Sequence, residues 1–181
     1  MKALAKASTI FAAALAVAAP GGWTDPVEVH YDVTKCLSYR ARWNGQLVAV
    51  EVTPEANWHT FAMDNRQRAE EKLAGRKSLG IDHPTEIKLT GGLEVVGPWY
   101  QTPPKDFSKP ELRWFSWGFE QRALLAAKVR RTGTGPAQIA IRGQACSESI
   151  CKNIDVTIPL PLAASKTDAN DIDLKALMQV R

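Results

Sequence analysis

Alternation of apolar and polar residues predicts that most of the chain forms β-strands. Residues 27–33 alternate strictly, as expected for a strand with one buried face. Residues 47–52 form a more continuously apolar strand, and Asn44-Gly45 just before it predicts a hairpin turn. Further short strands are predicted between glycine- and proline-rich turns, at residues 86–89, 93–96, 124–129, 137–144 and 155–160. Many short strands with such turn signals favour an all-β sandwich or barrel over an α/β sheet.

Two segments depart from the strand pattern. Asn65 is in a position to cap a helix over residues 66–74, which Gly75 or Gly80 would end. Because this segment contains few apolar residues, we expect a surface helix or an ordered loop. Residues 163–170 are polar and linker-like. Residues 171–180 predict a short final helix that docks on the sandwich through its apolar side chains, Ile172, Leu174, Leu177 and Met178.

The N-terminus has the pattern of a secretory signal peptide over residues 1–19. Lys2 and Lys6 precede an apolar run at residues 7–19, which contains the cleavage-type triplet Ala16-Val17-Ala18. Pro20 then interrupts any continuing helix. The run is too short for a membrane span, which needs about 20 residues. We therefore expect an exported, periplasmic protein.

Length and charge indicate one mature domain without a nucleic-acid partner. A β-sandwich is expected over residues 20–162, followed by a polar linker and short helix at residues 163–181. The chain has a formal net charge of +4, and loss of the two signal-peptide lysines leaves about +2. So small a charge, with basic and acidic residues interspersed, argues against nucleic acid or an anionic membrane surface. No other apolar stretch predicts a transmembrane segment after signal removal.

Three cysteines in an oxidising compartment allow at most one internal disulfide. A bridge between Cys146 and Cys151 closes a loop of about 6 residues, worth about 2 kcal/mol on the loop-entropy model, against about 5 kcal/mol for Cys36 to Cys146. The short bridge stabilises the fold less, so opening it would lower the free energy of unfolding only slightly. Spacing alone leaves a redox-active pair and an inert structural disulfide equally open. Cys36 lies in a predicted strand and is expected to be a buried small hydrophobe.

Strand phase predicts where the two sulfur atoms point. If residues 137–146 and 151–160 form a hairpin around residues 147–150, both cysteines lie on its outward face, opposite the apolar side chains. Directly opposed residues in an antiparallel pair have Cα atoms about 4.5–5.5 Å apart, which is within disulfide range. The phase therefore favours an accessible pair.

No metal or other cofactor is expected. The Cys146 to Cys151 spacing is close to that of metal-ligand pairs, but no second pair lies nearby to complete a site. The histidines add no candidate at this point. His59 follows Trp58 at a strand end and is expected to be structural, and His30 and His83 are expected to be exposed.

Three sequence segments carry a resemblance to a known family. The first is Gly143-Gln144-Ala145-Cys146-Ser147-Glu148-Ser149-Ile150-Cys151, followed by the strand at residues 156–160. The second is residues 52–61, which contain Trp58-His59-Thr60-Phe61, and the third is residues 83–89, which begin His-Pro-Thr. These segments resemble the cysteine hairpin, the Trp-His-x-aromatic turn and the Pro-Thr strand start of the N-terminal periplasmic domain of DsbD-type thiol:disulfide interchange proteins.

The resemblance implies an immunoglobulin-like sandwich and a redox function. Cys146 and Cys151 would cycle between dithiol and disulfide, one forming an intermolecular bond and the other resolving it. A thioredoxin-like or membrane electron-donor protein would supply electrons, and periplasmic disulfide-exchange acceptor proteins would receive them. In the family an aromatic cap loop shields the pair. The candidate counterparts here are Trp114, Phe115, Trp117 and Phe119.

The chain also departs from that family. Lys152-Asn153-Ile154 stands where members often carry proline after the second cysteine, and the basic stretch at residues 66–77 is unusual. No membrane or thioredoxin-like domain accompanies the sandwich in this sequence, so we expect the donor to act in trans. The alternative to a thiol:disulfide oxidoreductase is a non-enzymatic binding module with a structural disulfide, holding a partner protein or Cu(I).

Overall fold

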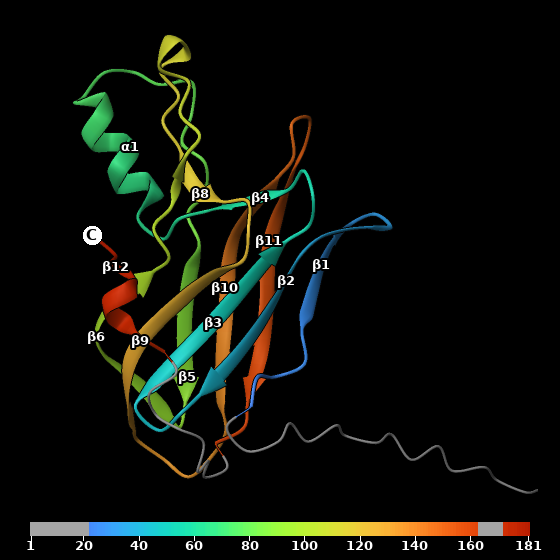
Figure 1. Ribbon diagram of the computed structural model, residues 1–181, viewed down its shortest axis with the longest axis vertical. Coiled ribbons are helices and arrows are strands. Elements are labelled where there is room, and N and C mark those ends of the chain that lie inside the picture. The colour runs from blue at the N-terminus through green and yellow to red at the C-terminus, as the bar shows by residue number, and fades with distance from the viewer. Residues whose placement is uncertain (1–21, 163–171) are drawn as a thin grey trace, which may run out of the picture.

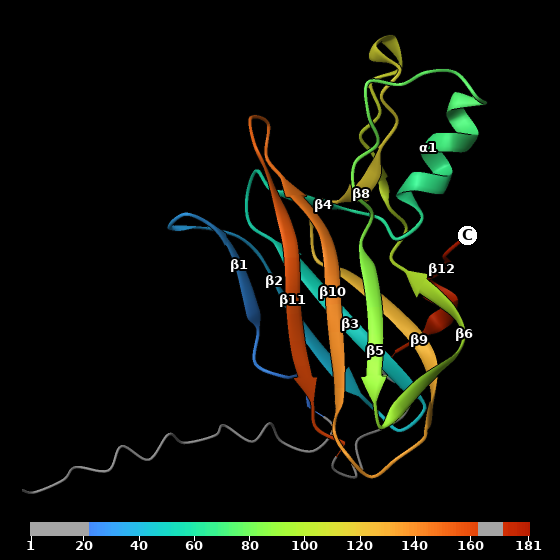
Figure 2. The same ribbon diagram turned by 180° about the vertical axis from the view of Figure 1, so that it is seen from behind.

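Two antiparallel β-sheets packed face to face form the body of the protein (Figures 1 and 2). The structure is a computed structural model that describes residues 22–162 and 172–181. The predicted all-β, immunoglobulin-like sandwich is confirmed by this arrangement. The predicted signal peptide, residues 1–19, and the predicted linker, residues 163–170, lie outside the described residues. Within the described ranges, no helix is long and apolar enough to cross a membrane.

The first sheet is built around the predicted Asn44-Gly45 hairpin. Its strands run in the order β1 (Val27–Tyr31), β2 (Thr34–Trp43), β3 (Leu47–Pro54), β9 (Ala123–Arg131), β6 (Leu93–Gln101) and β12 (Met178–Gln179). At the β2–β3 turn, Asn44 Oδ1 accepts hydrogen bonds from the backbone N–H groups of Gln46 and Leu47 at 3.2 and 2.8 Å. Gly45 supplies the left-handed φ of +100° that this turn needs.

The second sheet carries the two cysteines. Its strands run in the order β11 (Cys151–Leu160), β10 (Ala137–Cys146), β4 (His59–Phe61), β8 (Trp117–Phe119) and β7 (Lys105–Asp106), and β5 (Glu86–Gly91) also pairs with β10. The two ends of β10 have different neighbours. Residues 137–142 pair with β5, whereas Ala145 and Cys146 pair with β4. The sequence did not predict the short strands β4, β7, β8 and β12.

The core lies between the sheets and is filled by the inward side chains of the alternating strands. Its largest fully buried residues come from both sheets and include Leu37, Tyr39, Val48, Val50, Val52 and Leu125, and Ile139, Ile141, Ile158 and Leu160. A smaller cluster on the outer side of the first sheet packs Leu47 and Ala49 against Ala126 and Ile172. This second cluster covers the other face of β3, which explains why that strand is continuously apolar.

Helix α1 (Asn65–Leu73) lies on the surface, as the sequence predicts, but begins differently. Asp64, rather than Asn65, is the N-cap residue, and Asn65 is fully buried within the first turn. The side-chain amide of Asn65 is used for contacts with other segments, which a local capping pattern cannot indicate. The helix ends at Leu73, before the predicted Gly75 or Gly80, and its C-cap residue Ala74 adopts a left-handed φ of +48°.

The C-terminal segment docks on the sandwich without forming the predicted continuous helix. Ile172 is buried, and Leu174 and Leu177 pack against the same cluster. Leu174–Ala176 is a single turn of 3₁₀-helix, η2, after which β12 pairs with Tyr100 and Gln101 of β6. The open edge of β6 offers backbone partners to the last residues, so pairing replaces further helix.

The arm (residues 105–119), helix α1 and the tip of the β10–β11 hairpin lie at one end of the sandwich (Figures 1 and 2). The arm comprises β7, the 3₁₀-helix η1 (Pro110–Leu112) and β8. Because β4 pairs with both β10 and β8, it connects the cysteine hairpin to the arm.

Candidate redox site at the end of the sandwich

The β10–β11 hairpin places Cys146 directly opposite Cys151. Its antiparallel register runs without a break from Ala137 opposite Leu160 to this pair of cysteines. The two form a disulfide, with Cα atoms 4.0 Å apart. The predicted hairpin around residues 147–150 is therefore confirmed. The other cysteine, Cys36, is a free thiol.

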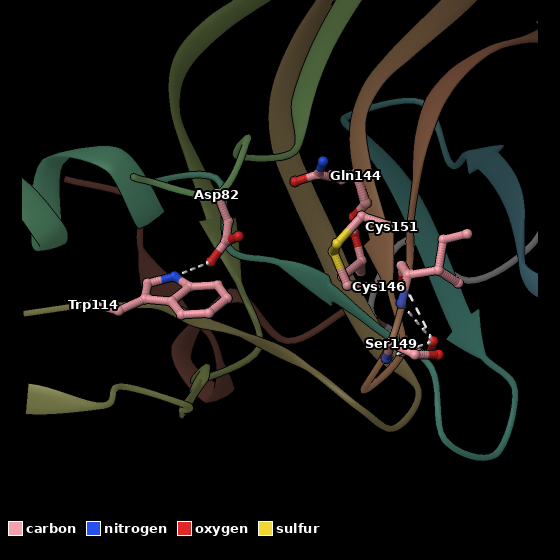
Figure 3. Close-up of a disulfide and its surroundings, with 9 residues drawn as sticks. Asp82, Trp114, Gln144, Cys146, Ser149 and Cys151 are labelled. Atoms are coloured by element: carbon pink, nitrogen blue, oxygen red, sulfur yellow. Dashed lines mark hydrogen bonds between the residues drawn. A yellow bond between two sulfur atoms is a disulfide. The ribbon is translucent and has the colours of Figure 1, made fainter. Parts of the chain in front are cut away.

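Ser147 closes the loop between the two cysteines. Its backbone N–H donates to the carbonyl oxygen of Ile150 at 2.8 Å. Its hydroxyl oxygen accepts hydrogen bonds from the N–H groups of Ser149 and Ile150 at 3.4 and 3.3 Å (Figure 3). A serine hydroxyl that bonds local backbone in this way stabilises a tight turn. The loop is thus held by its own residues.

The two cysteines differ sharply in exposure. Both lie on the face opposite the core side chains, because Ala145 on the other face belongs to the core cluster. Cys151 is exposed, since β11 is an edge strand of its sheet. Cys146 has an exposed fraction of only 3%, since β10 has neighbours on both sides. The expected outward face is correct for both, but the expected accessibility holds for Cys151 alone.

His59 is the third residue in this row. It lies in β4 directly opposite Cys146, on the side away from Cys151. Its imidazole meets the ring of Phe61 edge-on, with centroids 5.3 Å apart, and the ring of Phe107 at 4.9 Å. A small cavity of about 90 Å³ adjoins the ring, lined by His59, Phe61, Asp82, Phe107, Lys109, Trp114 and Ser116.

The environment of His59 favours the neutral imidazole. Burial lowers its pKa from the usual value, and the negative charges of Asp82 and Glu120 oppose this effect only in part. The carboxylate of Asp82 is held in place, because Trp114 Nε1 donates to Asp82 Oδ2 at 2.8 Å. Figure 3 shows this bonded pair on one side of the disulfide.

Buried side-chain hydrogen bonds fix β4 and the arm beside the hairpin. Thr60 Oγ1 donates to the carbonyl oxygen of Gln144 at 2.9 Å, which ties β4 to β10. Asn65 Oδ1 accepts from the N–H of Trp117 at 2.7 Å, and Asn65 Nδ2 donates to the carbonyl oxygen of Asp82 at 2.9 Å. Because these groups are buried, each bond left unmade would be costly. The position of His59 is therefore set by tertiary contacts on both sides of its strand.

The four candidate cap-loop aromatics occupy different environments. Trp117 and Phe119 lie in β8 and belong to the core cluster, and Phe115 packs against it. Trp114 is the one that lines the cavity beside His59. Phe107, which the sequence analysis did not single out, contacts the imidazole directly. Its proline-flanked segment has no pattern that would reveal this contact, because the arm must fold back before Phe107 reaches β4.

The remaining sequence candidates lie outside this row. Cys36 is completely buried, its thiol donates to the carbonyl oxygen of Thr34 at 3.7 Å, and burial raises its pKa. It matches the expected small hydrophobe rather than a reactive thiol. In residues 22–162 and 172–181, no three His, Cys, Asp or Glu side chains are grouped to hold a metal ion.

Comparisons with known proteins give a likeness of fold only. No family model and no curated protein matches the chain. Among solved structures, it is similar to the DsbD N-terminal domain of Neisseria meningitidis in the reduced form, at 11% identity and a TM-score of 0.49 over 70% of this chain and 85% of that one. It is also similar to the GAE domain of GGA2p from Saccharomyces cerevisiae, at 7% identity and a TM-score of 0.40 over 76% of this chain and 99% of that one.

Proposed function

We propose that the protein carries out thiol–disulfide exchange through Cys146 and Cys151. The observation that carries the proposal is their unequal exposure: Cys151 is exposed on an edge strand, whereas Cys146 is 97% buried beside it. An incoming thiolate can reach only an accessible sulfur atom, and the buried partner is then retained as leaving group and resolving thiol. A disulfide with a purely structural role needs no such difference in exposure between its two cysteines.

The exchange follows from this arrangement in two steps. A donor thiolate attacks Cys151 Sγ, the Cys146–Cys151 bond breaks, and its electron pair passes to Cys146 Sγ, which takes up a proton. A second donor thiolate then attacks the donor sulfur of the mixed disulfide and releases Cys151 as a thiolate. The donor becomes a disulfide and this protein a dithiol, so two electrons have moved. Reduction of an acceptor disulfide runs the same steps in reverse, beginning with attack by Cys151.

The location of the disulfide supports a bridge that opens without loss of the fold. The hairpin is held by ten register pairs and by the Ser147 loop bonds, independently of the sulfur atoms. Neither Cys146 nor Cys151 belongs to either hydrophobic cluster. On the loop-entropy model, so short a bridge contributes about 2 kcal/mol.

The proposed setting is the periplasm, with the protein acting as an electron relay. The signal-peptide pattern at residues 1–19 supports export. The proposed donor is a thioredoxin-like or membrane electron-donor protein acting in trans, and the proposed acceptors are periplasmic disulfide-exchange proteins. Proteins with thioredoxin-like folds expose a reactive cysteine, which matches the single exposed sulfur of this hairpin.

Reduction by a protein dithiol tests the proposal. The oxidised protein is mixed with an equimolar amount of reduced bacterial thioredoxin, and free thiols are alkylated at successive times and counted by mass. We expect rapid reduction of the Cys146–Cys151 bond, with the same result for a Cys36→Ser variant, because Cys36 lies outside the site. A disulfide that stays intact while thioredoxin reduces a control substrate would overturn the proposal.

A binding module with a structural disulfide is the outcome that such resistance would favour. Cu(I) titration of the chemically reduced protein then distinguishes a module that binds Cu(I) from one that binds a partner protein. Stoichiometric binding that is lost in the double Cys146→Ser, Cys151→Ser variant would identify a Cu(I) module. Absence of binding would leave a protein partner as the ligand.

A further inference from the structure

His59 completes a row of three directly opposed residues across the second sheet. Cys151 in β11 lies opposite Cys146 in β10, and Cys146 lies opposite His59 in β4. Directly opposed residues project from the same face of a sheet, with Cβ atoms about 4.5–5.5 Å apart. Cys146 therefore has the sulfur of Cys151 on one side and the imidazole of His59 on the other.

Aromatic contacts hold the imidazole in this row. Phe61 meets it edge-on from its own strand, and Phe107 covers it from the arm. The arm is in turn fixed to the body by the bond between Asn65 and Trp117. A side chain whose neighbours are themselves locked by packing and hydrogen bonds keeps its geometry relative to a reacting group.

The charged groups around the ring come from each segment packed on it. Asp82 precedes β5, Glu120 follows β8, and Lys109 of the arm lines the same cavity. Glu120 is itself paired with Lys105, at 2.6 Å. Burial outweighs the two carboxylates and keeps the pKa of His59 below its usual value. Near neutral pH the ring therefore carries one N–H donor and one acceptor nitrogen.

We propose that His59 exchanges a proton with the Cys146 thiol each time the disulfide opens and closes. The inference rests on the proposed function and assigns a role to a residue that the exchange chemistry alone does not identify. When the sulfur–sulfur bond breaks, Cys146 Sγ receives the electron pair. The proton that the donor thiol lost on ionising reaches this sulfur atom through His59, whose imidazole takes it up, passes it to the Cys146 thiolate and is left neutral. In the return step the Cys146 thiol gives its proton to the imidazole, the Cys146 thiolate attacks Cys151 Sγ of the mixed disulfide, and the imidazolium releases the proton to the departing partner thiolate.

The arrangement answers a difficulty that burial creates for Cys146. Removal from water raises the free energy of a thiolate, so a buried resolving cysteine would form its reactive state slowly. A hydrogen-bond donor beside the thiolate offsets that cost, and His59 lies directly opposite Cys146. Cys151 needs no such help, because water solvates its sulfur atom.

The test is a pH titration of the reduced protein by NMR, with the cysteine Cβ atoms labelled with ¹³C. For a His59→Phe variant, which keeps an aromatic ring and loses both nitrogens, we expect the midpoint of Cys146 to rise by about one pH unit. A His59→Gln variant keeps an N–H donor and should show a smaller rise. His30→Gln, at an exposed histidine of β1, is the matched control and should leave Cys146 unchanged.

Two results would overturn the role of His59. One is a folded His59→Phe protein in which Cys146 titrates at its parent midpoint. The other needs no variant: the imidazole signals of the parent should report the ionisation of Cys146 in the reduced protein and lose that inflection in the oxidised one, so identical curves contradict the proposal. Neither measurement uses a partner protein. A negative titration result would therefore contradict the role of His59 without contradicting the exchange reaction. Resistance of the disulfide to thioredoxin would contradict the exchange reaction without affecting the titration.

Discussion

At the residue scale, Cys146 and Cys151 have the same chemistry and opposite environments. Cys151 lies at the start of β11, which is an edge strand of its sheet within the part of the chain that the structure describes. Cys146 lies between Cys151 and His59 and has almost no contact with solvent. Reactivity of a thiol depends on access and on thiolate formation, so the two positions suit attack and resolution respectively.

This difference predicts unequal alkylation in single-cysteine variants. Iodoacetamide should modify Cys151 in a Cys146→Ser protein at least about tenfold faster than it modifies Cys146 in a Cys151→Ser protein, since only the former sulfur is exposed. Peptide mass analysis after quenching locates the label and shows whether buried Cys36 stays unmodified. Equal rates at the two positions, in variants that unfold at similar urea concentrations, would contradict the assignment.

At the element scale, the site depends on short segments that meet side by side. β4 has only three residues, yet it pairs with β10 on one side and β8 on the other. Its neighbour β8 approaches closely because Gly118 has no side chain. The start of α1 anchors this region through Asn65 and through a buried ion pair of Asp64 with Arg68, at 2.8 Å.

A methyl group at Gly118 should separate β4 from β8. A Cβ atom at this position would overlap the backbone carbonyl of Thr60, so Gly118→Ala must shift backbone rather than a flexible side chain. We expect a loss of about 2–3 kcal/mol in the free energy of unfolding by urea. Gly97→Ala is the matched control, because a Cβ atom there meets nothing within 4 Å. Destabilisation of the two variants by equal amounts would refute the close approach.

The Asp64–Arg68 pair predicts a pH dependence of stability. Burial alone would raise the pKa of Asp64, but hydrogen bonds from Arg68 and Gln101 lower it overall. A carboxyl group whose folded pKa is lowered stabilises the fold above its unfolded pKa, about 3.9, and loses that contribution as the pH falls through the folded value. Asp64→Asn should therefore cost about 2 kcal/mol at pH 7 and progressively less below pH 4 or so. Urea unfolding of both proteins from pH 7 to pH 3 measures this, and a pH-independent difference would contradict it.

At the scale of the whole molecule, the sequence predicts the regular strands well and the end that carries the site poorly. The β10–β11 hairpin and the outward face of its cysteines follow from a strict alternation, which depends only on local geometry. The burial of Cys146 and the contact of Phe107 with His59 depend on where the arm packs, and no local pattern encodes that. For the same reason, the sequence predicts only a structural role for His59, whereas the fold places His59 opposite Cys146.

Reduction of the disulfide should leave the molecule folded. The main core cluster joins the two sheets without either bridged cysteine, and a short loop contributes about 2 kcal/mol on the entropy model. We therefore expect the reduced protein to keep its far-UV circular dichroism and to unfold at a modestly lower urea concentration. The Cys146→Ser, Cys151→Ser variant should match the reduced protein. Collapse of the native spectrum on reduction would show that the bridge is a structural staple.

The most direct test of the central claim is a redox titration of the Cys146–Cys151 pair. The protein is equilibrated in buffers of defined thiol–disulfide potential, its thiols are alkylated, and the oxidised fraction is read by mass. We predict a midpoint between about −270 and −120 mV, the range over which thioredoxin-like proteins exchange electrons. A midpoint below about −300 mV, where structural disulfides lie, would contradict the account.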